Sequence, residues 1–580
     1  MMDRFLKITA LAVGLSSSTV MGQDYERFAP KPVPKDSSEV EIVSNIPEAM
    51  GSDEVLVDAL SGVVLVQSGD AVKRDGQSVQ GLSMQGFDLL VGSDFPAVVE
   101  PYFGKPVTLL MLNQLSRDII VFYRQMNFPL VDVIVPEQDI TTGTVQLVVT
   151  ESLLGTVRAE GNRWVASRTL EGQVRINSGE RIDARRLLKD INWLNQNPFR
   201  SVDVVFTEGE ELGTTDILLR TEDRFPIRIY AGYEDTGNDL TGEERFIFGA
   251  NWGNAFFLDH QLNYQYTAST NFEDVAAHSV SYVAPLPWRH TLTAFASFVD
   301  TQADAVPFTL AGSSAQAGIR YTVPLPDIKT YAHEVYAGFD WKQSDNTLEF
   351  GFVPVSANTE DIGQFLFGYR ASLPDRFGVS ALDLQVVHSP GGIFGHQNDS
   401  DFRSVRATAD DDYTYLRLNV SRLTRLPWDF TLSTELNWQI TNTSLLASEQ
   451  LGFGGFSSIR GYDERELINT DEGFFIRNEL RLPAFSVLQL FGQTVGEKWA
   501  DDQLQFLAFW DYGMAEAASG QVTRIDGSTA DRVYMSGIGP GLRYTVNQWL
   551  SVRADYAFQL IDTRNGRYAS RWHLGIIVSY

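Results

Sequence analysis

Apolar and polar residues alternate along most of the chain from Phe225 to Tyr580. In Gln261–Thr267, every second residue is leucine or tyrosine, and the residues between them are glutamine, asparagine and threonine. The stretches 430–441 and 550–560 show the same period of two. Because the side chains of a β-strand point alternately to its two faces, this pattern predicts strands and not helices.

The two faces of these strands differ in a way that indicates a membrane barrel. One face is aliphatic and aromatic, and the other carries Gln, Asn, Ser, Thr and paired charges. A soluble β-sandwich also alternates, but its strands are short and its polar face is mostly charged. A transmembrane barrel has strands of about ten residues, with lipid on one side and water on the other. We therefore expect an outer-membrane β-barrel over residues 224–580.

Turn signals divide this region into about sixteen antiparallel strands, an even number as in bacterial single-chain barrels. Short turns that contain proline occur at 285–287, 324–326, 373–375 and 426–428, and longer gaps separate them. This asymmetry is expected when short turns face the periplasm and long loops face outward. The expected strands lie near residues 225, 245, 258, 278, 291, 315, 334, 362, 381, 413, 430, 474, 504, 533, 550 and 570.

The N-terminal 52 residues have two parts. Residues 1–22 resemble a secretory signal peptide, because Arg4 and Lys7 precede an apolar stretch and small residues follow it. Residues 23–52 hold four prolines among charged and small residues, which is typical of a linker. A weak signal predicts a short helix at Ser38–Ser44.

Two small α/β modules are predicted between the linker and the barrel, at 53–152 and 153–223. In the first, Thr108 opens a helix that runs through Tyr123, and a hairpin of strands at 130–135 and 144–150 follows. Leu112, Leu115, Ile119 and Phe122 form an apolar face on this helix, which we expect to point inward.

The second module reads as strand, helix, helix, strand, strand. A serine cap is expected to open the first helix, Ser167–Arg175, and Asp183 to open a second helix that runs through Asn195. The strands are expected at 155–160, 202–207 and 216–221. Neither module contains a phosphate loop or a metal-binding cluster.

The long gap 442–473 between two expected strands contains a glycine-rich stretch. It includes Ile459, Arg460, Gly461 and Tyr462 in sequence. One interpretation is a surface loop with a solvated arginine. The other is a hairpin folded into the barrel lumen, which requires a buried partner for the guanidinium.

Such a partner is present in the strand expected near residue 504. Trp510 and Tyr512 lie on the apolar face of that strand, so Asp511 between them must face the lumen. Gly513 leaves space for a closely packed loop. A carboxylate in this position is a natural acceptor for the guanidinium of Arg460.

These residues resemble the motifs of a known superfamily. Ile459–Tyr462 resembles the VRGY/IRGY motif in the sixth outer loop of the BamA-type superfamily. The strand segment Phe509-Trp510-Asp511-Tyr512-Gly513 resembles its F-x-D-x-G motif, and 537–544 is similar to the glycine-rich strand that follows. The two modules resemble polypeptide-transport-associated (POTRA) domains. Having two of them points to the transporters of two-partner secretion, the haemolysin and filamentous-haemagglutinin secretion proteins.

Two departures from the family pattern are visible. The signature of the first module usually begins with Gly-Tyr, and Asn127-Phe128 stands there in this chain. The stretch Gln67–Val79 looks like an insertion. The resemblance otherwise covers nearly the whole chain after residue 22.

The resemblance implies a pore in the outer membrane of a Gram-negative bacterium, with the POTRA domains in the periplasm. Its client would be a large secreted protein of adhesin or cytolysin type, unfolded in transit, which adds as a strand to an exposed POTRA sheet edge. Arg460 would anchor the loop to Asp511, beside Phe509 and Gly513. The last strand, which ends at Tyr580, would be the insertion signal that the barrel assembly machinery reads at the lipid boundary.

Two other functions fit parts of the pattern. An assembly factor that inserts other barrels would have the same architecture, but such proteins usually carry more POTRA modules. A passive porin or receptor would explain the barrel but neither the two modules nor the inward-facing arginine.

The composition disfavours enzymes and nucleic-acid binders. The 580 residues contain no cysteine, and the seven histidines lack a metal-ligand spacing. Gly537, Gly539 and Gly541 lie in an expected strand, so a dinucleotide site is not expected, and no G-x-S-x-G motif occurs. A formal charge of −28 disfavours binding to nucleic acid. We expect no enzymatic activity, no metal and no cofactor.

Overall fold

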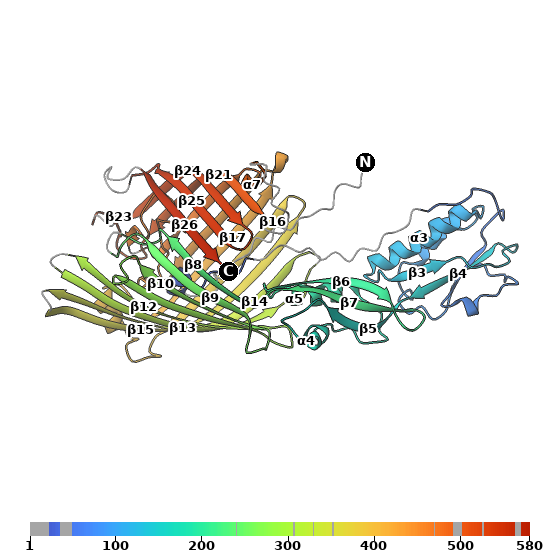
Figure 1. Cartoon of the computed structure of the whole chain (residues 1–580), viewed down its shortest axis with the longest axis horizontal. Helices are drawn as coiled ribbons and strands as arrows, with labels where there is room; N and C mark the ends of the chain where they lie inside the picture. The colour runs from blue at the N-terminus through green and yellow to red at the C-terminus, as the bar shows by residue number, and fades with distance from the viewer. Residues whose placement is uncertain are drawn as a thin grey trace. The chain divides into compact units, whose positions relative to one another are not determined.

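The computed structural model describes residues 23–34, 49–238, 241–305, 308–328, 330–350, 353–468, 470–490, 501–524, 527–562 and 570–580. These residues form two compact units (Figure 1). One unit contains residues 49–225, and the other contains residues 23–34 together with the chain from Pro226 to the C-terminus. The expected signal peptide and the helix expected at 38–44 lie outside the described residues.

The first module is a four-stranded sheet covered by one long helix. The sheet has the order β2-β1-β4-β3, in which β1 pairs parallel with both neighbours and β3 pairs antiparallel with β4. The hydroxyl of Thr108 accepts a hydrogen bond from the Met111 amide at 3.1 Å, which confirms the predicted cap. The elements are β1 Gly62–Val66, η2 Gly69–Ala71, β2 Gly81–Met84, α2 Pro96–Val99, η3 Glu100–Tyr102, α3 Leu109–Gln125, β3 Val131–Ile134 and β4 Thr144–Glu151.

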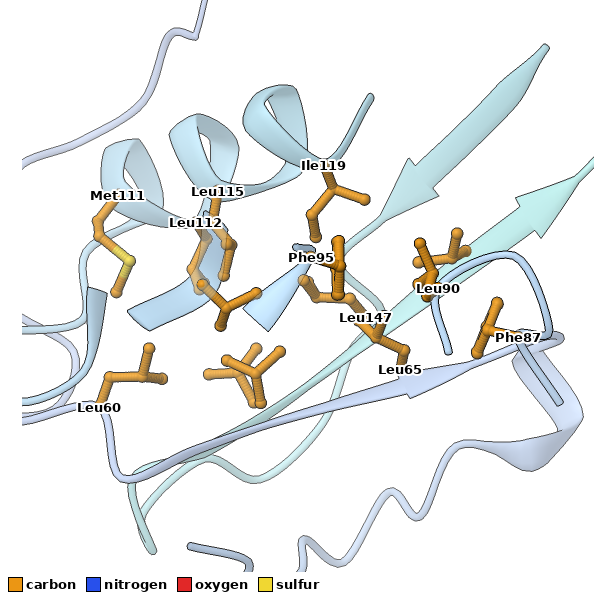
Figure 2. Packing of buried hydrophobic residues seen from close by; sticks show 14 of the residues in the cluster. Leu60, Leu65, Phe87, Leu90, Phe95, Met111, Leu112, Leu115, Ile119 and Leu147 are labelled. Carbon is orange, nitrogen blue, oxygen red and sulfur yellow. The ribbon is translucent and has the colours of Figure 1, made fainter. Parts of the chain in front are cut away.

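Helix α3 packs its apolar face onto the sheet of the first module (Figure 2). Leu112, Leu115 and Ile119 point from the helix toward Leu65 and Leu147 of the strands, and all five are buried. Removing apolar side chains from water is the main favourable term in folding such a module. This core therefore holds the helix on the sheet.

The second module has the predicted order of strand, helix, helix, strand, strand. Its sheet has the order β5-β7-β6, and Asp183 caps α5 by accepting hydrogen bonds from the amides of Arg185 and Arg186. Its elements are β5 Leu153–Glu160, α4 Ser167–Glu171, α5 Ala184–Leu194, β6 Arg200–Glu208 and β7 Thr214–Asp223.

The prediction for the first helix of this module was wrong in two details. Helix α4 ends at Glu171 and not at Arg175, because Gly172 follows it and favours the end of a helix. The residue that precedes the helix is Ala166, so no serine caps it. The hydroxyl of Ser167 instead exchanges hydrogen bonds with the Asn162 side chain.

A single residue separates the last strand of the first module from the first strand of the second. The carboxylate of Glu151 accepts a hydrogen bond from the Tyr123 hydroxyl at 2.7 Å and one from Nε of Arg181 at 2.5 Å. Burial, followed by the hydrogen bond to this carboxylate, raises the pKa of Tyr123 above its ordinary value. Glu151 thus ties the two modules together at their joint.

The remaining chain forms a closed barrel of sixteen strands, as predicted (Figure 1). Neighbouring strands pair antiparallel, and β26 closes the barrel by pairing with β8. The strands are β8 Ile227–Glu234, β9 Arg245–Ala255, β10 His260–Ser269, β11 Val275–Pro285, β12 Thr291–Ala305, β13 Phe308–Pro324, β14 Ala332–Phe350, β15 Val353–Asp375, β16 Gly378–Pro390, β17 Asp412–Arg425, β18 Thr431–Thr441, β20 Glu472–Arg481, β21 Asp502–Glu516, β24 Arg532–Val546, β25 Leu550–Gln559 and β26 Ser570–Ser579.

Short elements occur in the connections between these strands. The predicted asymmetry is present, because turns such as 376–377 alternate with long loops such as 391–411. The additional elements are α1 Gln23–Phe28, α6 Asp399–Val405, η4 Pro427–Asp429, β19 Leu467–Ile468, α7 Val487–Leu490, β22 Val522–Arg524 and β23 Thr529–Ala530. Over the part of the chain that the structure describes, none of the helices combines the length and apolarity needed to cross a membrane.

The two faces of the barrel wall differ as the sequence pattern predicts. On β21, the outward side chain of Trp510 is 48% exposed, whereas its neighbour Asp511 is fully buried. Charged side chains on the inner face pair with each other, as Arg320 and Asp340 do at 2.7 Å. A wall that is apolar outside and polar inside fits a lipid-embedded barrel with a wet lumen.

Candidate functional site in the barrel lumen

The loop 442–471 between β18 and β20 folds into the barrel, and we call it the lumenal hairpin. Its motif residues Ile459, Arg460 and Tyr462 are each fully buried. A buried guanidinium is strongly unfavourable unless acceptors surround it. The hairpin therefore depends on the acceptors that the barrel wall supplies.

Arg460 binds three carboxylates from three strands of the wall. Its Nε and Nη2 donate to the two oxygens of Asp511 on β21, at 2.7 and 2.8 Å. Its Nη1 donates to Glu479 on β20 at 2.7 Å and to Asp555 on β25 at 3.3 Å. The Arg460 amide also donates to Asp511 at 3.1 Å. Two parallel hydrogen bonds to one carboxylate fix the orientation of the guanidinium as well as its position.

An aromatic ring covers one face of the same guanidinium. Cζ of Arg460 lies 3.6 Å from the centre of the Phe509 ring. A cation over an aromatic face is attracted to it, most strongly where water is excluded. Asp511 and Phe509 are two residues apart on β21, so their side chains point to the same face of the strand. One strand therefore supplies both the carboxylate and the ring.

Glycines on the wall let the hairpin backbone approach closely. A Cβ at Gly513 would lie 2.6 Å from Cδ1 of Ile459, and one at Gly537 would lie 1.9 Å from the carbonyl oxygen of Arg460. Gly461 has a φ of +98°, a conformation that side chains disfavour. The space that the sequence predicts at Gly513 is therefore occupied by the hairpin.

Tyr462 and Gly461 add hydrogen bonds on the other side of the motif. The Tyr462 hydroxyl donates to the carbonyl oxygen of Ile561 at 2.6 Å and accepts from the Ser536 amide at 3.0 Å. The Gly461 amide donates to Nε2 of His573 on β26 at 2.9 Å. The motif thus contacts the wall from β20 to β26.

Glu479 and Asp555 were not identified by the sequence analysis as partners of Arg460. Both also accept from Arg543 on β24, at 3.1 and 2.6 Å. The sequence indicated that Asp555 lies on the polar face of its expected strand. Alternation along a strand shows which face a residue occupies, but it does not show which residues of distant strands lie at the same height in the barrel.

Asp471 holds the outer end of the hairpin. Its carboxylate is fully buried and accepts from both Nη atoms of Arg406 in the loop 391–411, at 2.5 and 2.8 Å. It also accepts from the amides of Leu445 and Ala518. One carboxylate therefore joins three outer loops above the lumen.

Helix α1 lies inside the barrel against a different part of the wall. The Tyr25 ring packs 4.6 Å from that of Phe295, and its amide donates to Gln316 at 3.1 Å. Phe28 packs with apolar residues of β11 and β12, among them Val275. Residues 23–52 are predicted to be a linker, and the structure shows that the first of them are held in the lumen.

The segment that follows α1 is also fixed to the wall. Nζ of Lys31 pairs with Glu234 on β8 at 2.7 Å, and its amide donates to the Tyr230 hydroxyl at 2.9 Å. A cavity of about 400 Å³ remains between this segment, the hairpin and the wall. Both segments therefore stand in the path of a polypeptide that crosses the lumen.

Comparisons with known proteins agree with this architecture. The family model described as "Haemolysin secretion/activation protein ShlB/FhaC/HecB" matches residues 213–543. The chain belongs to this family. A second family model, "POTRA domain, ShlB-type", matches residues 78–152. The family consists of outer-membrane transporters that secrete partner proteins, so this member of the family is an outer-membrane protein transporter.

Individual relatives of this family member are distant but cover most of the chain. The heme/hemopexin transporter protein HuxB of Haemophilus influenzae (strain 86-028NP) is 22% identical over 512 residues, which is 86% of each chain. The outer membrane transporter CdiB-2 of Burkholderia pseudomallei (strain 1026b) is 22% identical over 78% of each chain. The structure of CdiB from Escherichia coli aligns over 94% of each chain with a TM-score of 0.71 at 16% identity, which shows the shared fold.

A methyl group at residue 537 would overlap the carbonyl oxygen of Arg460. We expect Gly537→Ala to weaken docking of the lumenal hairpin by roughly 1–3 kcal/mol, the usual cost of overpacking. Trypsin added to intact cells should then cleave after Arg465 in the hairpin, while the barrel keeps its heat-modifiable migration in gels. Gly395→Ala is the control, because a Cβ there meets nothing within 4 Å. Equal trypsin resistance of the two variants would contradict the docking geometry.

Proposed function

We propose that the chain exports one large client of adhesin or cytolysin type, which crosses the outer membrane unfolded. The observation that carries this proposal is the lumenal hairpin, held by a buried arginine inside a barrel that two POTRA-like modules precede. A passive pore has no need of such a device. The chain acts as a conduit and not as an enzyme.

We infer that the chain divides into a signal peptide at 1–22, a linker at 23–52, POTRA domains at 53–152 and 153–223, and a barrel at 224–580. The joint between β4 and β5 at Ser152 and the end of β7 at Asp223 support the two inner boundaries. Helix α1 is the part of the linker that enters the barrel.

We propose that the client first binds to the edge of β6 in the second module. The Asn195 side chain accepts a hydrogen bond from the outward amide of Val202 at 2.8 Å and donates one to the carbonyl oxygen of Val202 at 3.0 Å. In an antiparallel pair, every second residue turns its amide and carbonyl groups away from the partner strand. The next outward groups on β6 are therefore those of Val204 and Phe206. In the described part of the chain, no hydrogen bond reaches these groups. Main-chain bonding to such an edge tolerates many client sequences.

Arg460 is the proposed anchor of the conducting state, with Asp511 as its principal wall partner. Ile459, Gly461 and Tyr462 position the guanidinium through packing and backbone hydrogen bonds. Helix α1 and the segment after it must leave their place beside β8–β13 before a client passes. The proposed driving force for export is folding of the client outside the cell. Passage through the lumen includes no other step that would keep the client outside.

We propose that the last strand, β26, together with the 83% exposed Tyr580 that follows it, is the signal that the barrel assembly machinery reads. Its outward residues Trp572 and Val578 are also exposed, as expected for side chains that meet outer-membrane lipid.

Arg460→Ala is expected to abolish export while the barrel still inserts. The substitution leaves Asp511 as a buried charge without its cation, which costs roughly 3–5 kcal/mol, whereas Glu479 and Asp555 keep Arg543. The client is identified as the protein that disappears from the cell surface and medium when the chain is deleted. Mass spectrometry of both fractions then measures its export by each variant.

Arg422→Ala is the control for that experiment. Arg422 also pairs with an aspartate, Asp375, at 2.9 Å, but both side chains are about one-third exposed. Such pairs contribute only about 0–1 kcal/mol, so export should persist. Export by Arg460→Ala at the wild-type level would refute the proposed role of the anchor.

Val204→Pro tests the proposed client edge. Proline removes the outward amide but is tolerated on an edge strand. Loss of one main-chain hydrogen bond worth about 1 kcal/mol should reduce client affinity about fivefold. Val204→Ala keeps the amide and serves as the control. Measured by pull-down of the unfolded client, equal affinities of the two variants would exclude this edge.

A further inference from the structure

The stem of the lumenal hairpin, residues 445–449, has a second buried ion pair, remote from Arg460 in the tip, residues 459–462. The carboxylate of Glu449 contacts Nζ of Lys342 on β14, and the two side chains are 1% and 3% exposed. The same carboxylate accepts from Nε2 of Gln364 on β15 at 3.1 Å and from the Tyr415 hydroxyl on β17 at 2.8 Å. Three strands thus converge on a single carboxylate that belongs to the hairpin.

Apolar packing accompanies this ion pair. Leu445 and Leu446 of the hairpin are buried in one cluster with Ile362, Tyr413 and Phe402. The Tyr413 hydroxyl donates to the oxygen of Gln364 at 2.7 Å, which orients that amide toward Glu449. The hairpin stem is therefore seated on the sector of the wall from β14 to β17.

The two ends of the hairpin are held with different firmness. Arg460 binds three carboxylates and an aromatic ring, and its carbonyl oxygen fits against Gly537. Glu449 faces a single ammonium and three neutral donors, one of which is the hydroxyl of the adjacent Ser448. A lysine is a compact charge on a flexible stem, whereas an arginine that binds a carboxylate with two nitrogens is geometrically fixed. The Glu449 segment is consequently the part that can leave the wall, while Asp471 and Arg406 hold the outer loops together above it.

We propose that the Lys342–Glu449 pair is a releasable anchor. Its release frees the stem from the β14–β17 sector and widens the lumen for the client, while Arg460 keeps the tip of the hairpin on the wall. Carboxylates and carbonyl oxygens of an arriving unfolded chain can compete for the Lys342 ammonium. This inference rests on the proposed transport function and adds positioning residues to it.

The chain contains no cysteine, so a single introduced cysteine reports the position of one end of the hairpin. Leu446→Cys reports the stem and Ile459→Cys the tip, because both residues are at most 3% exposed. A membrane-impermeant maleimide is applied to cells that express the full chain. The labelling rate of each cysteine is then proportional to the time that its segment spends away from the wall.

Adding Glu449→Gln should accelerate labelling at residue 446 about tenfold, the factor that one charge-assisted hydrogen bond of about 1.4 kcal/mol gives, and leave residue 459 slow. Lys342→Met should act in the same way. Exchanging the charges with Lys342→Glu and Glu449→Lys should return the rate toward the wild-type value. Glu435→Gln is the control, since that lumenal carboxylate is 45% exposed and lies 3.7 Å from its nearest cation. Heat-modifiable migration of each variant confirms a folded barrel.

Unchanged labelling at residue 446, or equal acceleration at residues 446 and 459, would overturn the proposal. The first result would mean that the pair does not hold the stem, and the second that the hairpin moves as one body. Failure of the charge exchange to slow labelling would also count against it. None of these labelling results depends on export. Failure of the proposed function is a different result, normal export by Arg460→Ala, which would refute the transport role of Arg460.

Discussion

The structure of the lumen depends on the burial of one guanidinium. Arg460 is fully buried, and only the three carboxylates of Glu479, Asp511 and Asp555 make that position tolerable. These acceptors come from three strands, so the guanidinium is satisfied only when β20, β21 and β25 are assembled in the wall and the hairpin lies against them. The wall in turn needs glycine at residue 537, because a side chain there would displace the hairpin backbone. Hairpin and wall therefore specify each other.

The inner wall is divided into three sectors by what lies against it. Helix α1 and the segment after it contact strands from β8 to β13, the hairpin stem contacts β14–β17, and the hairpin tip contacts β20–β26. Under the proposed function a client needs space in the lumen, and release of two of the three contacts would provide it without breaking the Arg460 network. We propose that this division lets one barrel be closed at rest and still keep a fixed element during transport.

Much of this fold follows from the sequence because a membrane imposes strict alternation. Lipid outside and water inside require a change of polarity at every residue, so all sixteen strands and the inward side of Asp511 were predictable. Helix α1 was not, because Tyr25 and Phe28 are stabilised by residues roughly 250–290 positions away and the helix has only six residues. Glu479 and Lys342 were missed for a related reason. Alternation assigns a face to each residue, whereas partners across a lumen depend on strand stagger.

Photocrosslinking tests most directly whether the hairpin stays on the β20–β21 wall while a client passes. Phe475 of β20 lies 6.0 Å, between ring centres, from Phe453 of the hairpin. A photoreactive phenylalanine analogue at residue 475 can therefore join the two, and mass spectrometry identifies the product. The account predicts that irradiated cells form this crosslink and continue to export the client. Export that stops on irradiation in proportion to the crosslink would contradict it, because the hairpin would then have to leave the wall.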